Sequence, residues 1–143
     1  MGRLINLAAI LSCSASVAVA HHELADRDII RGQLNYQNHC ASCHGANLEG
    51  QPNWREYNED GSLPAPPHDE TGHTWHHPDS YLFLMTKYGI EEMIGKTYPN
   101  NMPAYKDKLT DEEILAALSY IKSTWSSRIQ RQHDQINARA KAQ

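Results

Sequence analysis

Cys40-Ala41-Ser42-Cys43-His44-Gly45 is the most specific motif in this chain of 143 residues. It contains the pattern C-x-x-C-H, through which proteins attach c-type haem. Two thioether bonds to one edge of the porphyrin hold the macrocycle, and the histidine after the second cysteine then lies beneath the iron. The stretch therefore predicts one covalently attached haem c per chain, held by Cys40 and Cys43, with His44 as an iron ligand.

Two other chemistries use a C-x-x-C pair. A thioredoxin-like redox site needs a βαβ context, and no alternating apolar run here is long enough for a strand. A structural zinc site needs four closed ligands; the nine histidines could supply some of them, but there is no second cysteine pair. Haem attachment is therefore the favoured interpretation.

Residues 1–20 have the pattern of a secretory signal peptide. Met1-Gly2-Arg3 begins with a positive charge, an apolar stretch follows, and Ala18-Val19-Ala20 resembles a cleavage site. Cleavage would leave a chain beginning at His21, soluble in the periplasm or another exported compartment, where c-type haem is attached.

A lipid anchor is the alternative at this end of the chain. Ile10-Leu11-Ser12-Cys13 loosely resembles a lipoprotein processing site with Cys13 as the lipid-bearing residue. Membrane association is expected only through such a lipidated or an uncleaved N-terminus.

Composition excludes several classes of protein. With 40% hydrophobic and 21% charged residues the chain is too apolar for wholesale disorder, and a mean hydropathy of −0.66 is too polar for a multi-span membrane protein. A net charge of −4 argues against nucleic acid as a partner. Residues 21–121 carry 7 basic and 16 acidic side chains, a net charge of −9, which favours protein redox partners with basic docking patches.

A second iron ligand is expected downstream of the haem motif. Met102 lies in Pro99-Asn100-Asn101-Met102-Pro103-Ala104, a turn-rich loop where no periodicity requires an apolar side chain. A thioether in such a loop is a good candidate for a metal ligand. Met85 and Met93, which could equally be packed in the core, are the alternatives.

Three segments have helical patterns and none reads as a strand. The first is Asp26–His39; the second begins around Pro78 and ends at Gly89, since proline suits a first helical turn and glycine the position after the last. The third begins with the capping box Thr110-Asp111-Glu112-Glu113. Its apolar stripe consists of Ile114, Leu115, Leu118, Ile121 and Trp125.

Over about residues 26–127 the sequence resembles the class I c-type cytochromes. In that family an N-terminal helix crosses a C-terminal helix, often through a glycine and an aromatic residue; Gly32 and Tyr36 match that pair, and Tyr120 looks like their partner. The resemblance implies an all-α fold with the haem held between helices and loops. It also implies His44 as proximal and Met102 as distal ligand, and one-electron transfer without substrate chemistry.

The resemblance further implies a proline carbonyl that accepts a hydrogen bond from the proximal imidazole. Gln51-Pro52-Asn53 looks like the family loop that provides it, so Pro52 is predicted to support His44 from outside the ligand shell.

Two regions depart from a minimal cytochrome of this class. Within the predicted domain, residues 21–127, the Pro- and His-rich loop 55–77 is inserted. Its histidines are His68, His73, His76 and His77. They suit a second site for copper or zinc, or else bond the haem propionates, cap the following helix or face solvent. Residues 128–143 form a polar basic tail, expected to be a solvated or frayed helix end, with contact to anionic lipid or an acidic partner as the alternative.

The sequence therefore predicts an exported electron carrier rather than an enzyme. Closed His and Met ligation leaves the iron no position at which to activate a substrate. The alternatives are a copper-handling or sensing haem protein that uses the histidine loop, and the haem subunit of an oxidoreductase complex.

Overall fold

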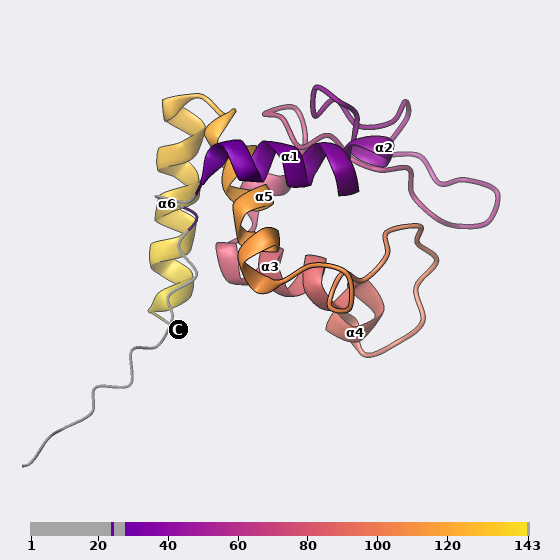
Figure 1. Ribbon diagram of the computed structural model, residues 1–143. Coiled ribbons are helices and arrows are strands. Elements are labelled where there is room, and N and C mark those ends of the chain that lie inside the picture. Colours follow the sequence, from indigo (N-terminus) through magenta and orange to yellow (C-terminus); the bar gives the residue numbers. More distant parts are fainter. Residues whose placement is uncertain (1–23, 25–27, 143) are drawn as a thin grey trace, which may run out of the picture.

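The computed structural model describes Leu24 and residues 28–142, and within these residues the chain is helical with no strand (Figure 1). The helices are α1 (Ile29–His39), α2 (Ala41–His44), the 3-10 helix η1 (Thr74–His76), α3 (Asp79–Tyr88), α4 (Ile90–Ile94), α5 (Asp111–Ser123) and α6 (Ser127–Lys141). The predicted all-α fold is confirmed. The predicted signal peptide and Cys13 lie outside the described residues.

The centre of the fold is the crossing of α1 and α5. At Gly32 a β-carbon would stand 2.1 Å from the carbonyl oxygen of Ala116, so only glycine permits this approach of the two backbones. One turn later the buried Tyr36 ring packs on Tyr120, with ring centroids 5.6 Å apart. Helices α1 and α5 therefore cross through the residues that the family resemblance implied.

Local signals set the helix ends. The Asp28 side chain accepts a hydrogen bond from the Arg31 N–H at 3.0 Å, so α1 begins at Ile29, three residues after the predicted start. Pro78 and Gly89 bound α3 as predicted, and Gly89 has a positive φ of 81°. The capping box at the start of α5 is also confirmed, because the side chain and backbone of Thr110 both bond with Glu113.

The predicted apolar stripe, four residues of α5 and Trp125 just beyond its end, forms the core. All five of its residues are buried, and they pack with Leu82 and Phe83 of α3 in one hydrophobic cluster. Each such side chain stabilises the fold by roughly 1.5–3 kcal/mol on burial.

The prediction of a solvated or frayed tail after residue 127 is wrong. α6 packs along the side of the fold (Figure 1), with Ile129 and His133 at 2% and 0% exposure. Asn137 accepts a hydrogen bond from the Asp79 N–H at 2.7 Å and donates one to the Asp79 carboxylate at 2.9 Å. Because most inward residues of α6 are polar, its sequence looked like a solvated helix although its inner face is a packed hydrogen-bonding surface.

The inserted loop folds back against the haem motif without forming a helix before η1. Gln51 is paired with Ala65 through its backbone N–H at 2.9 Å and its side-chain oxygen at 2.7 Å, which closes the excursion between them. Gly50 has a φ of 70°, and a β-carbon there would come within 2.5 Å of the Pro67 nitrogen. This close approach brings the proline pair Pro66-Pro67 next to α2.

Candidate haem-binding site

Cys40 lies between α1 and α2, and the rest of the haem motif, up to His44, forms α2. The Cys40 N–H donates to Tyr36 O at 2.8 Å, and the His44 N–H donates to Cys40 O at 2.9 Å, so both cysteines and the histidine lie within one helical turn. Neither cysteine forms a disulfide; Cys43 is exposed and Cys40 half-buried. The Tyr36 hydroxyl donates to Gly45 O at 2.8 Å, which fixes the end of the turn.

Burial and the nearby Cys43 raise the pKa of Cys40 to about 11. The Cys40 side chain is therefore a protonated thiol at neutral pH until it is used in a covalent bond.

The His44 ring is oriented by a carbonyl group. Its Nδ1 lies 2.8 Å from Pro66 O, and because a carbonyl only accepts, Nδ1 carries the proton and Nε2 keeps its lone pair. Burial lowers the pKa of His44, and the hydrogen bond to Pro66 opposes this shift in part. The ring is thus held as the neutral imidazole, the form that binds iron.

The predicted role of Pro52 is wrong, because Pro66 supplies the carbonyl. Pro52 is exposed and lies just after Gln51, where the chain leaves the site; Pro66 follows Ala65, where the chain returns. Spacing alone does not reveal which proline of a long loop folds back. The consecutive prolines before His68 are the signal that could have indicated it, since two fixed φ angles make a stiff segment.

His68, which the sequence groups with the other histidines of the inserted loop, lies against His44 in the structure. Its ring stacks on His44, with centroids 3.9 Å apart and planes inclined by 22°. Its Nδ1 is 2.7 Å from the Thr74 hydroxyl oxygen. Burial, followed by the neighbouring His44 and His73, holds the pKa of His68 well below its usual range, so this ring is neutral at physiological pH.

The described residues do not assemble the second metal site that is one of several interpretations of the loop histidines. Among the residues that the structure describes, no group of three or more histidine, cysteine or acidic side chains is arranged to hold a metal ion. His68 lies against His44, His76 packs on Trp75 with ring centroids 3.7 Å apart, and only His73 and His77 approach each other, at 3.3 Å between Nδ1 and Nε2. Two of the four rings, His68 and His76, are therefore engaged in contacts with His44 and Trp75.

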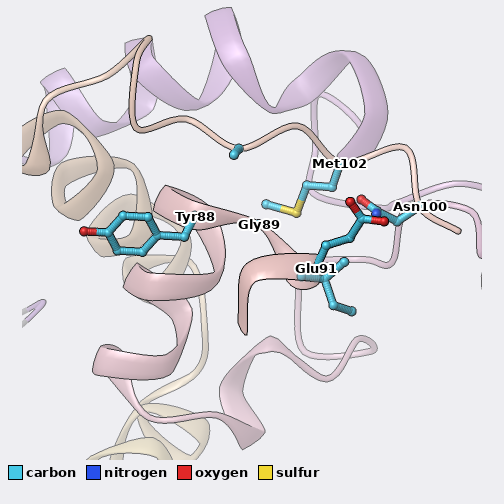
Figure 2. Close-up of a pocket in the computed structure, with 7 residues that line it drawn as sticks. Tyr88, Gly89, Glu91, Asn100 and Met102 are labelled. Atoms are coloured by element: carbon cyan, nitrogen blue, oxygen red, sulfur yellow. The ribbon is translucent and has the colours of Figure 1, made fainter. Parts of the chain in front are cut away.

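Met102 lies in the loop between α4 and α5, and the residues that line its pocket do not include Cys40, Cys43 or His44. It is 36% exposed and lines a pocket with Tyr88, Gly89, Glu91 and other residues of α3, α4 and this loop. Figure 2 shows its thioether extending over the Gly89 turn, with Tyr88 to one side and Glu91 to the other. Met85 and Met93 are half-buried within α3 and α4.

These residues fit a c-type haem. Two unpaired thiols stand at C-x-x-C spacing, the adjacent imidazole presents its free nitrogen, and a thioether is accessible on a separate loop. The helical fold and this donor set together define a c-type haem protein.

Comparison with known proteins identifies the family. The protein-family model named Cytochrome c matches residues 29–125, so the chain belongs to the cytochrome c family. It is a haem-containing electron-transfer protein with covalently attached haem c, and one haem per chain is typical of such a domain. No significant match is found among curated proteins or among solved structures.

Two general properties of the family bear on the chain. Its members are generally electron carriers rather than enzymes, and cytochrome c domains are usually exported. No helix in the described part of the chain combines the length and apolar character that crossing a bilayer requires.

Proposed function

We propose that this protein is an exported mono-haem cytochrome that carries single electrons between redox partners, with His44 and Met102 as the axial ligands. The observation that carries the proposal is the hydrogen bond from His44 Nδ1 to Pro66 O. His44 directly follows the second cysteine of the C-x-x-C pair. This hydrogen bond leaves Nε2 as the donor atom and fixes the tautomer before any metal binds.

When bound, the haem supplies an iron that alternates between ferrous and ferric states. The proposed ligands would restrict the iron to electron transfer. Cys40 and Cys43 would tether the group, and with His44 and Met102 both bound to the iron no position would remain for a substrate. A methionine thioether also favours the ferrous form, which predicts a positive reduction potential.

The acidic character of the chain supports partners with basic docking patches. Glu91 lines the Met102 pocket and Glu92 follows it on α4, and both side chains are exposed. Complementary charge at such a surface increases the rate of encounter more than it increases affinity, as a carrier with rapid turnover requires.

The ferric absorption spectrum of the haem-loaded protein tests the ligation. We expect low-spin iron with a sulfur-to-iron band in the unmodified protein, and loss of that band with conversion to high spin in Met102→Ala. Met93→Leu is the matched control, because it removes a second thioether close by. High-spin iron in the unmodified protein would favour an enzyme and contradict the proposed carrier.

Export is tested separately. We expect the haem-stained protein in the periplasmic fraction, with His21 as its first residue. A lipidated protein that moves from membrane to soluble fraction in Cys13→Ser would instead establish the anchored alternative.

A further inference from the structure

We propose that His68 is a positioning residue that sets the plane of the His44 imidazole. This inference rests on the proposed function in one respect, namely that His44 is an axial ligand. The observation behind it is the stacked contact of the two rings, 3.9 Å between centroids with planes inclined by 22°.

The hydrogen bond to Pro66 alone does not fix the ring plane. It holds one atom of His44, Nδ1, at 2.8 Å from the carbonyl oxygen. Hydrogen bonds to carbonyl oxygens tolerate a broad range of donor directions, so the imidazole retains some freedom to rock about this point. A flat ring against one face removes that freedom, because rotation of His44 would drive its edge into His68.

His68 can restrain its neighbour because it is itself held from several directions. Its backbone N–H donates to Leu48 O at 2.8 Å, and its carbonyl accepts from Trp125 Nε1 at 2.8 Å. The Thr74 hydroxyl bonds to its Nδ1 at 2.7 Å. Three separate parts of the chain therefore fix its backbone and ring, and Tyr36 adds an edge contact at 6.3 Å between centroids.

The same short segment thus supplies both restraints on the ligand. Pro66 contributes the carbonyl that selects the nitrogen, and His68, two residues later, contributes the surface that selects the plane. Support of this kind, from groups outside the ligand shell, is how proteins orient a metal ligand and tune the metal.

The plane of an axial imidazole has a direct spectroscopic consequence. In low-spin ferric haem the orientation of that plane, together with the orientation of the ligand on the opposite face, sets how unpaired spin is distributed over the porphyrin. The proton NMR shifts of the haem methyl groups report this distribution, and a change that only lowers stability does not move them.

The experiment compares the haem methyl shifts of the loaded ferric protein in a set of variants. In His68→Leu, which lacks the flat ring, we expect the pattern to be redistributed. In His68→Phe, which keeps a flat ring, we expect a pattern close to that of the unmodified protein. Thr74→Val, which removes the 2.7 Å hydrogen bond but keeps the histidine, should give a smaller change in the same direction. His76→Leu is the control, since His76 is exposed and contacts Trp75.

An unchanged pattern in His68→Leu would overturn the inference. If His68→Leu does not fold, Thr74→Val decides: shifted methyl resonances support the inference, and shifts identical to the unmodified protein overturn it. Failure of the proposed function is recognised independently, because it appears in the unmodified protein as high-spin iron or as a spectrum indifferent to Met102→Ala.

Discussion

The two sides of the candidate haem site are built differently. His44 is 7% exposed, bonded to a carbonyl and stacked on a second ring, whereas Met102 is 36% exposed in a loop. That loop begins after Gly95 and is tied down by Tyr105, whose N–H donates to Thr86 O at 3.1 Å. The fold therefore sets the orientation of the histidine in advance, whereas the proposed Met102 ligand has no comparable support from hydrogen bonds or ring contacts among the described residues.

Replacement of His44 and replacement of Met102 should have unequal consequences. Replacing the fixed ligand, in His44→Ala, should abolish the haem spectrum of the accumulated protein, because the turn loses the donor that orients the metal. Replacing the exposed ligand, in Met102→Ala, should leave the haem attached and lower the reduction potential by ~0.1–0.3 V, within the ~0.8 V that axial ligands span.

Haem staining after denaturing electrophoresis and a redox titration measure both outcomes. Equal loss of haem in the two variants would contradict the proposed difference between the sides.

The crossing of α1 and α5 supports the turn that carries His44. In Gly32→Ala the new β-carbon would meet Ala116 O at 2.1 Å, which backbone atoms can relieve only by separating α1 from α5. We expect a loss of about 3 kcal/mol or more in the free energy of unfolding, at the upper end of overpacking effects. Denaturant titration measures it, with the exposed Gln33→Ala as control; a loss no larger than the control's would be inconsistent with a tight crossing.

Acid should destabilise the protein, because the fold packs neutral histidines in its interior. The pKa of His68 is well below its usual range, and burial also lowers the pKa of His133 despite Asp79 Oδ1 at 3.3 Å. His133 Nε2 also faces His77 O at 2.9 Å, and its Nδ1 is buried without a hydrogen-bond partner, so a second proton there would be unpaired.

The unfolded chain therefore binds protons that the folded chain does not, and stability should fall as the pH drops below about 6.5. Each histidine contributes a slope of about 1.4 kcal/mol per pH unit until its folded-state pKa is reached. Chemical denaturation between pH 5 and 8 measures the slope, which His133→Gln should reduce. A flat profile would show that neither histidine differs in pKa between the two states.

Replacement of Pro66 and replacement of Pro52 should differ slightly in their effect on the reduction potential. Pro66→Ala keeps the carbonyl but loosens the backbone that aims it, which weakens the hydrogen bond to His44 and makes the imidazole a poorer donor. The reduction potential should rise by less than ~59 mV, the tenfold step for a one-electron couple. Pro52→Ala, at the exposed proline, should leave the potential unchanged, and voltammetry of both proteins makes the comparison.

The frame of the fold could be predicted from sequence because its determinants are local. The capping box at Thr110, the boundaries at Pro78 and Gly89, and the spacing of Gly32 and Tyr36 before the haem motif each involve residues within one or two helical turns. The C-x-x-C-H pattern is local in the same sense.

The support of His44 could not be predicted in this way. The separation of 22 residues between His44 and Pro66 is bridged by an irregular loop, whose path depends on the pairing of Gln51 with Ala65 and on the close packing at Gly50. The helix α4 could not be predicted for another reason: it has only five residues, and no side chain caps its start.

The packing of α6 changes what counts as the smallest independently folding piece of this protein. The family match stops at Trp125, yet the indole of that residue lies against His133, with centroids 5.1 Å apart, and the carboxylate of Asp79 is bonded to Asn137. A fragment trimmed to the family boundary would uncover the indole and strip a buried carboxylate of its donor. In this cytochrome α6 is part of the packed core. A chimaera that carried only the matched region, residues 29–125, would lack these contacts.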